Sequence, residues 1–193
     1  MRGVRRDEVL DLTGYERIRE AFLAKTIALK RPRRISVGDR LTFIFENRDT
    51  VLFQIQEMLR AERAVKEEKI EDEIAVYNEL VPGANELSAT LMIEIPELRQ
   101  VRAELDRLIG IDEHVFLEVG GERVRASFDR KQFESDRISA VQYVRFPLGP
   151  ALACKFCDPA VPARLRVEHP NYRESTELAG ESRASLAADL ASA

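Results

Sequence analysis

The chain has 193 residues, of which 45% are hydrophobic and 33% are charged, and its formal net charge is −4. This composition excludes an intrinsically disordered protein, because such chains combine low hydrophobicity with high net charge. Two cysteines exclude a disulfide scaffold. No apolar run approaches the roughly 20 residues of a membrane span, and the start, MRGVRRDEVLDL, has no signal-peptide core. We therefore expect a cytoplasmic protein with a single domain over residues 1–193.

Residues 12–30 are predicted to form the first helix. Thr13 and Glu16 have the spacing of a capping box at its start, and Pro32 ends the helical pattern. The basic cluster at residues 30–34 (KRPRR) is interpreted as a solvated helix end, with phosphate binding as the alternative. A pI near 5.5 and the absence of Trp make a nucleic-acid partner an unfavoured hypothesis.

A strand is predicted at residues 41–46 (LTFIFE), which are rich in aromatic and β-branched side chains. Asp49 is the expected N-cap of the helix that follows. The apolar residues of that helix recur at helical spacing: Val51, Leu52, Ile55, Met58 and Leu59. A hairpin with VLFQIQ as its return strand is the alternative. The helix is favoured because the apolar stripe continues past Gln56.

Periodicity predicts three more elements in the middle of the chain. A helix covers residues 70–81 and ends at Pro82-Gly83, and whether it continues the preceding helix is left open. Residues 86–95 alternate between apolar and polar side chains, which indicates a strand. Residues 98–108 form a helix, which Gly110 closes in a left-handed conformation.

Residues 114–128 (HVFLEVGGERVRASF) carry the strongest local signal in the chain. A two-residue Gly120-Gly121 turn between alternating runs predicts a β-hairpin, because both glycines tolerate positive φ. The predicted pairs on one face are Val119–Glu122, Leu117–Val124 and Val115–Ala126, and those on the other are Glu118–Arg123, Phe116–Arg125 and His114–Ser127.

The remaining segments complete an α+β fold. Strands are predicted at residues 138–148 and 163–168, a short helix at residues 150–158, and an Ala-rich helix at residues 182–190 followed by a frayed tail from about residue 190. The Gly-Gly hairpin requires antiparallel pairing. We therefore expect a mainly antiparallel sheet with helices packed on one side.

The candidate reactive residues are two cysteines and two histidines. Cys154 and Cys157 form a C-x-x-C, whose spacing suits thiol redox chemistry or half of a zinc site. His114 and His169 are the only histidines and could complete a Cys₂His₂ set. The alternative is that the cysteines are small apolar side chains on a short helix. No cofactor is predicted, and zinc or iron is the metal that these residues would suit.

The helix after Asp49 offers a candidate binding surface on its polar side. Gln56, Glu57 and Arg60 lie there, and His169 is added as a possible neighbour. Gln side chains both donate and accept hydrogen bonds, and Arg binds carboxylates bidentately, so these groups suit specific polar recognition. The alternative is a solvated helix face.

Four sets of residues carry a resemblance to a known family. They are Glu46–Val51 with Phe53–Arg63, Asp112–Val115 with Leu117–Val124, Ser139–Tyr143 with Arg145–Leu148, and His169–Tyr172. Together they resemble a bacterial domain-of-unknown-function family, number 3501, from about residue 10 to residue 190. The C-x-x-C is not part of the family pattern.

The resemblance implies a biochemical context rather than an activity. Genes of the family often neighbour those of rubrerythrin-like di-iron proteins and of iron–sulfur proteins related to heterodisulfide reductase subunits. The resemblance therefore implies a non-catalytic accessory or adaptor protein of a redox or oxidative-stress system, with one of those proteins as its partner. The alternative is a metal-dependent or thiol-redox enzyme that uses His169, His114, Glu57 or the Cys154/Cys157 pair. The sequence predicts no membrane partner and leaves the oligomeric state open.

Overall fold

The computed structural model describes residues 1–129, 133–134 and 137–191 of the chain. The helices in these residues are α1 (Leu12–Lys30), α2 (Arg48–Ala61), α3 (Glu67–Asn78), α4 (Val101–Asp106), α5 (Gly149–Cys157) and α6 (Gly180–Ala191). The strands are β1 (Arg34–Val37), β2 (Leu41–Glu46), β3 (Glu86–Ile93), β4 (Val115–Val119), β5 (Glu122–Arg125), β6 (Ser127–Phe128), β7 (Phe133–Glu134), β8 (Arg137–Ile138), β9 (Val141–Pro147), β10 (Ala163–His169) and β11 (Tyr172–Glu177). The end of the predicted frayed tail, residues 192–193, lies outside the described residues.

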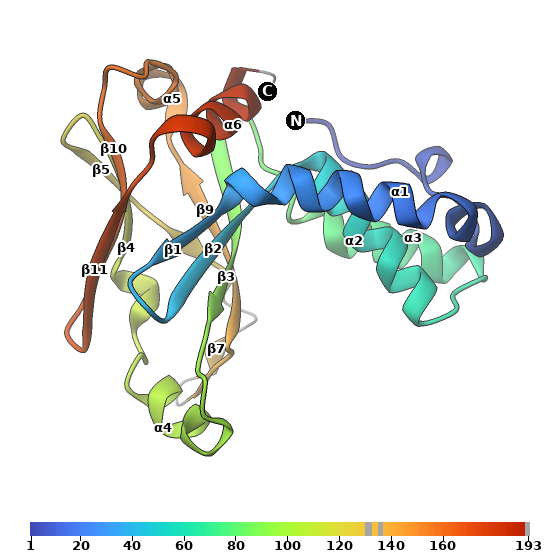
Figure 1. Ribbon diagram of the computed structural model, residues 1–193, viewed down its shortest axis with the longest axis horizontal. Helices are drawn as coiled ribbons and strands as arrows, with labels where there is room; N and C mark the ends of the chain where they lie inside the picture. Colours follow the sequence, from blue (N-terminus) through green and yellow to red (C-terminus); the bar gives the residue numbers. More distant parts are fainter. Residues whose placement is uncertain (130–132, 135–136, 192–193) are drawn as a thin grey trace.

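Nine of the strands form two antiparallel sheets that face each other (Figure 1), and β7 and β8 form a separate antiparallel pair. The larger sheet has the order β1-β2-β3-β9-β6, and the smaller has the order β11-β10-β4-β5. The predicted α+β class and the antiparallel pairing are confirmed. Side chains from both sheets share one hydrophobic core, which includes Phe43, Leu91, Phe146, Leu117 and Leu165. The single main sheet of the prediction is thus divided in two, because alternation identifies the buried face of a strand but not its neighbours.

The predicted Gly-Gly hairpin is confirmed in its register. β4 and β5 pair from Phe116 opposite Arg125 to Val119 opposite Glu122. The turn at Gly120-Gly121 has φ values of +58° and +87°, which is the left-handed region that a side chain would strain. The local sequence pattern therefore predicted both the turn and the pairing of β4 with β5 correctly.

The chain leaves the hairpin to join the other sheet at one side of the core. Ser127 pairs with Arg145 of β9 rather than with His114, so the last predicted pair of the hairpin is wrong. The backbone N–H of Ala126 still donates to Val115 O at 2.9 Å, and the crossing follows directly. One continuous segment, β5 to β6, therefore belongs to both sheets.

Side chains bridge the two sheets at the opposite side, where β1 and β11 lie next to each other. Tyr172 Oη donates to Val37 O at 2.6 Å, and Thr176 Oγ1 donates to Ser36 O at 2.6 Å. Gly38 has φ +67°, and a Cβ atom there would lie 2.2 Å from Tyr172 Oη. The close approach of this turn to the tyrosine therefore requires glycine.

Helices α5 and α6 cover one end of the core between the sheets, and the segment that includes α4 covers the other end. Leu152 and Phe156 of α5 and Leu186 of α6 enter the core at one end. Leu108 and Ile111, which follow α4, enter it at the other end (Figure 1). Gly110 is left-handed at φ +91°, as the sequence predicts.

Helices α1, α2 and α3 form a layer that extends from the sheets (Figure 1) and has its own hydrophobic core. Val51, Ile55 and Leu59 of α2 pack there, which confirms the helix over the alternative hairpin. α3 is a separate helix, because Arg63 adopts φ +51° in the connection. Among the described residues, no helix combines the length and the apolar character needed to cross a membrane.

Two helix caps differ from the prediction. Asp11, not Thr13, caps α1, and its carboxylate accepts a backbone N–H of the first turn at 2.6 Å. Asn47, not Asp49, caps α2, and it exchanges two hydrogen bonds with Thr50. Reciprocal bonds satisfy two free N–H groups at once, which explains why Asn47 is preferred.

Three strands, β1, β7 and β11, were not predicted, and a fourth is interrupted. β1 begins at the last residue of the basic cluster and alternates over only four residues, β7 has two residues, and β11 exposes most of its side chains. β1 and β11 both lie at edges of their sheets. The strand expected at residues 138–148 is divided into β8 and β9.

Arg33, in the turn between α1 and β1, is only 1% exposed, although the sequence predicts a solvated helix end at this position. Its Nε donates to Phe45 O at 2.8 Å, and its Nη2 donates to Glu46 O at 3.1 Å. Its Nη1 donates to Ser185 Oγ at 3.1 Å, and its guanidinium forms an ion pair with Asp189. This one side chain therefore joins the end of α1, the end of β2 and α6.

We expect Arg33→Met to lower the free energy of unfolding by about 3–5 kcal/mol, because it leaves the buried Asp189 carboxylate without its charged partner. Arg34→Met is the control, since Arg34 and its partner Glu94 are both exposed, and exposed pairs contribute up to about 1 kcal/mol. Urea unfolding followed by circular dichroism measures both. Similar small losses for the two variants would contradict this role of Arg33.

Candidate functional site

A cavity of about 480 Å³ opens where the C-terminal end of α3 meets the outer face of the five-stranded sheet. It lies at the junction between the helical layer and the sheets, and residues of β2, β3, β6 and β9 form its other walls. The polar side chains that the sheet contributes are Glu46, Ser88, Ser127, Asp129, Tyr143 and Arg145. We call this cavity the α3 cavity.

Strand register explains why polar groups gather in the α3 cavity. One row across four strands consists of Glu46, Ser88, Arg145 and Ser127. In the next row on the same face, Thr90 lies opposite Tyr143. The residues between them, such as Ala89 and Val144, turn to the core. The alternation of the strands thus creates a polar floor under α3.

Glu46 is a carboxylate at the inner end of the α3 cavity, and only 7% of it is exposed. Thr50 Oγ1 donates to it at 2.5 Å, and Thr90 Oγ1 donates to it at 2.8 Å. Lys30 Nζ lies 3.9 Å away. Arg33 holds the backbone carbonyl of the same residue. Burial of this charge is therefore compensated, and the carboxylate is fixed in one position.

Two tyrosines contribute hydroxyl groups to the α3 cavity. Burial raises the pKa of Tyr143, and the neighbouring carboxylates of Glu46 and Asp129 raise it further. Burial also raises the pKa of Tyr77 on α3. Both phenols are therefore protonated at neutral pH.

Arg145 connects the sheet to the end of α3 at the wall of the α3 cavity. Its guanidinium hydrogen-bonds the carboxylate of Glu86 and the backbone carbonyl of Glu79. Ser88 Oγ likewise donates to Leu80 O at 2.6 Å. Carbonyl groups at the C-terminal end of a helix lack partners within the helix. These contacts therefore supply their partners and hold α3 against the sheet.

Gln56, predicted to face a ligand or partner, is buried instead. Only 2% of it is exposed. Its Oε1 accepts a hydrogen bond from Leu10 N at 2.7 Å, and its Nε2 donates to Leu10 O at 3.2 Å. The side chain imitates a strand partner and fixes the segment that precedes α1.

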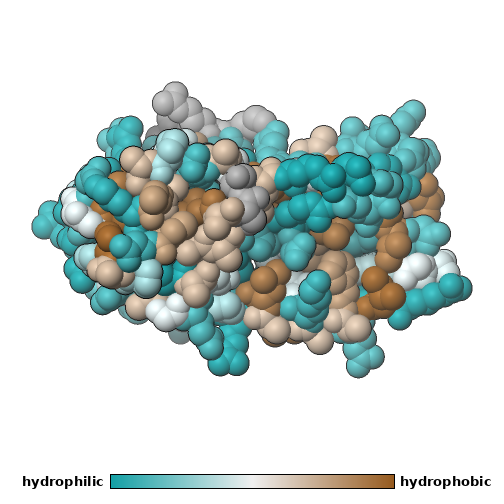
Figure 2. Space-filling view, turned by 90° about the horizontal axis from the view of Figure 1, so that it is seen from above, coloured by the Kyte–Doolittle hydropathy of each residue, from teal (hydrophilic) through white to brown (hydrophobic). Residues whose placement is uncertain are grey.

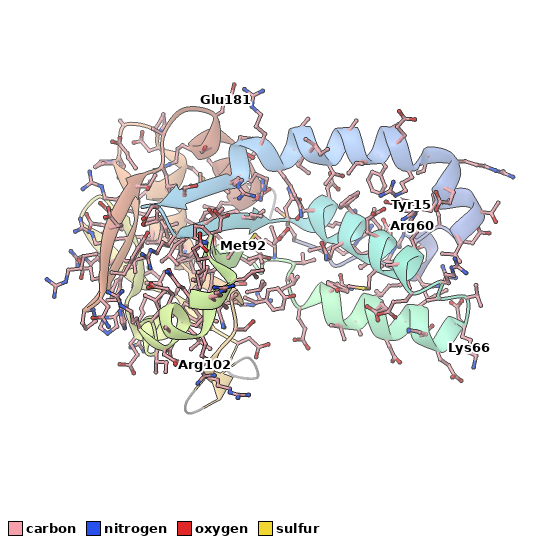
Figure 3. All side chains as sticks on the ribbon, turned by 60° about the horizontal axis from the view of Figure 1, so that its bottom comes forward. Tyr15, Arg60, Lys66, Met92, Arg102 and Glu181 are labelled. Atoms are coloured by element: carbon pink, nitrogen blue, oxygen red, sulfur yellow. The ribbon has the colours of Figure 1, made fainter. Side chains whose placement is uncertain are left out.

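Glu57 and Arg60 lie at the interface between α1 and α2, where Figure 3 shows Arg60 beside Tyr15. Glu57 accepts hydrogen bonds from Tyr15 Oη at 2.7 Å and from Arg19 at 2.8 and 2.9 Å. Arg60 donates to Glu16 at 2.6 Å. Arg19, and then Tyr15, hold the pKa of Glu57 below its usual range, against the opposing effect of burial. In the structure, the polar side of α2 therefore binds α1.

The two histidines meet in the smaller sheet, with ring centroids 5.3 Å apart and rings nearly perpendicular. His169 is 4% exposed. Its Nε2 donates to Ile109 O at 3.0 Å, and its Nδ1 accepts from Asn171 N at 3.2 Å. Both ring nitrogens of His169 therefore form hydrogen bonds with the backbone. Since Glu57 belongs to the helical layer, the structure does not bring His169 together with it.

Cys154 and Cys157 are reduced and exposed, near the C-terminal end of α5. Redox-active cysteines commonly lie at the N-terminal end of a helix, whereas these two lie towards the C-terminal end. Cys157 Sγ donates weakly to Ala187 O at 3.7 Å. Within the described ranges, no group of three or more His, Cys, Asp or Glu residues could hold a metal ion. The C-x-x-C and the histidines therefore do not combine into a zinc or iron site there.

The sequence did not reveal the residues of the α3 cavity. Glu46 and Tyr143 lie within predicted strands, and their alternation with apolar residues is the signal that places them on the outer face. Nothing local to either strand indicates that a helix end covers this face. The site depends on strand pairings between separate segments of the chain, such as Glu46 with Ser88 and Ser88 with Arg145, which a single sequence does not specify.

We expect Glu57→Gln to lower the free energy of unfolding at pH 7, because Arg19 and Tyr15 lose their charged acceptor. The folded-state pKa of Glu57 is lowered, so its stabilising effect is present above the unfolded-state pKa and is lost as the pH falls through the folded-state pKa. The difference from the wild type should therefore shrink below about pH 4.3. Glu20→Gln, at an exposed position of α1, controls for the loss of one charge. A difference that is independent of pH would contradict the ion pair.

Comparisons with known proteins place the chain among uncharacterised proteins. A crystal structure of a novel protein of unknown function from Burkholderia pseudomallei superimposes with a TM-score of 0.92 and 37% sequence identity, over 98% of this chain and 100% of that chain. No curated protein matches. The family model DUF3501, described as a protein of unknown function, matches residues 3–190. The chain therefore belongs to the DUF3501 family.

Proposed function

We propose that the chain is a non-catalytic cytoplasmic accessory protein that binds a partner at the α3 cavity. The observation that carries the proposal is the cavity itself, which combines fixed polar groups with an open position between two structural layers. Ligand sites occur preferentially at such junctions, and they combine apolar walls with a few oriented polar groups.

The polar groups of the α3 cavity suit recognition rather than chemistry. Glu46 has hydrogen-bond donors on both carboxylate oxygens, and Arg145 is held by Glu86 and by a backbone carbonyl. Groups held in this way present a fixed pattern of charge and hydrogen bonds. The histidines and cysteines, which a metal-dependent or thiol-redox enzyme would use, do not line the cavity. This separation favours an adaptor over an enzyme.

The proposed partner follows from the family resemblance. A rubrerythrin-like protein or an iron–sulfur protein related to heterodisulfide reductase subunits would place the adaptor in redox or oxidative-stress metabolism. Val76, at the mouth of the α3 cavity, is 61% exposed, although it is a large apolar side chain. An exposed apolar group beside a polar floor is typical of the place where a partner side chain enters.

We expect Val76→Trp to weaken binding of a purified rubrerythrin-like or iron–sulfur partner at least about tenfold, the effect of losing one well-packed contact. The indole would occupy the mouth of the α3 cavity without disturbing a core. Val65→Trp is the matched control, because Val65 is 75% exposed but does not line the cavity. Isothermal titration calorimetry measures binding, and thermal melting checks the fold.

The possible outcomes distinguish an error in the proposed binding site from an error in the proposed partner. If the wild type binds and both variants bind equally well, the α3 cavity is not the binding site. If the folded wild type binds neither kind of partner, the redox assignment is wrong.

A further inference from the structure

A second cavity, of about 320 Å³, lies between α5 and α6 at the end of the core and shares no lining residue with the α3 cavity. Its walls are largely apolar and include Val161, Pro162, Leu178 and Ala184. Figure 2 shows hydrophobic surface among hydrophilic patches on the part of the molecule that carries these helices. Arg183, Cys157 and Glu177 are the cationic, thiol and acidic groups that line it, and Glu177 is exposed. We call it the α6 cavity.

Arg183 is a buried cation, since only 6% of it is exposed. Its Nε donates to Phe156 O at 2.6 Å, and its Nη2 lies 3.1 Å from Val161 O. The guanidinium stacks on the ring of Phe156 at 3.8 Å. These contacts hold the side chain in one position at the wall of the cavity.

The charge of Arg183 has no carboxylate partner in the described part of the chain. The backbone carbonyl of Asp158 accepts a hydrogen bond from Nη2 of Arg183 at 3.4 Å, whereas its carboxylate accepts a hydrogen bond from Ala160 N at 2.9 Å and acts on the guanidinium only through its charge. Burial lowers the pKa of Arg183. The hydrogen bonds of the guanidinium to the described residues are made by Nε and Nη2, so Nη1 remains open to a ligand. Four backbone carbonyls and the Phe156 ring stabilise this charge, and an anion at Nη1 would add the ionic partner that these neutral groups do not supply.

The N-terminus of α6 adds a second set of donors to the same cavity. Ala179, which precedes the helix, has no side chain that can cap it, and Gly180 lines the α6 cavity. The first backbone N–H groups of a helix have no acceptor within the helix. They also form the positive end of its dipole. α6 has 12 residues, so this positive end belongs to a helix of full length.

We propose that the α6 cavity binds a small organic carboxylate. Its carboxylate group would lie between Arg183 and the first turn of α6, and its apolar part would lie against the apolar walls. One open guanidinium nitrogen beside a helix end suits a monoanion, because a phosphate dianion is normally held by several cationic or N–H donors. The volume suits a molecule of few atoms.

Cys157 provides a reporter for the site, because its thiol lines the α6 cavity and its side chain is exposed. Cys154, one turn earlier on α5, is also exposed but does not line the cavity. The two cysteines of the same molecule therefore form a matched pair for chemical labelling.

The first experiment compares alkylation of the two cysteines by iodoacetate, an anion, and iodoacetamide, its neutral counterpart. We expect the iodoacetate-to-iodoacetamide rate ratio at Cys157 to exceed that at Cys154 at least about threefold at low salt, since a fixed positive field concentrates anions. High salt should reduce the difference. Mass spectrometry of the peptides measures each rate. Equal ratios at the two cysteines would overturn the proposal.

The second experiment uses benzoate, with benzamide as the neutral control. Benzoate should slow the labelling of Cys157 by iodoacetamide and leave that of Cys154 unchanged, whereas benzamide should slow neither. Ala184→Phe, which fills the α6 cavity from an exposed position, should remove this protection. Ala188→Phe, one turn further along α6 and outside the lining, should keep it. Equal protection by benzoate and benzamide, or protection that survives in Ala184→Phe, would overturn the anion site.

Discussion

The buried ion pair between Arg33 and Asp189 is the interaction on which the arrangement of the layers depends. Arg33 donates hydrogen bonds to the last two carbonyl groups of β2 and to Ser185 of α6, and it forms the ion pair with Asp189 of the same helix. Because a buried guanidinium must satisfy its donors, these three segments have essentially one way to meet. The helical layer leaves the sheets directly after β2, so the same contacts set its direction (Figure 1).

The position of the α3 cavity follows from this attachment. The helical layer and the sheets have separate cores, and α3 returns to the sheet only at its C-terminal end. On the polar side of α2, Gln56 binds the segment that precedes α1, and Glu57 and Arg60 bind α1. The polar groups of the α3 cavity lie where the two layers join. Glu46, whose backbone Arg33 holds, is the link between the ion pair and the cavity.

Local signals made much of the fold predictable. The Gly120-Gly121 hairpin and the apolar stripe of α2 depend on neighbours within one or two turns of chain. The edge strand β1 was missed because its alternation extends over only four residues directly after the basic cluster, and β11 was missed because it exposes most of its side chains. Arg33 was assigned to the solvent because Lys and Arg are rarely buried without a partner, and its partner lies 156 positions away. The sequence likewise indicated that Gln56 and Glu57 are polar residues of α2. It did not indicate their partners, because these lie in a distant part of the chain.

The sequence distance between Arg33 and Asp189 also has a consequence for synthesis. Three contacts that close the molecule join the first fifth of the chain to the last: Arg33 with Asp189, Val37 with Tyr172, and Ser36 with Thr176. A chain emerging from the ribosome can form α1, α2 and the first hairpin early, since these are local. Arg33 must wait for α6, and the edge formed by β1 must wait for β11, until those later segments have left the ribosome. The contacts that join the two sheets and the helical layer therefore form last, after the local elements are already in place.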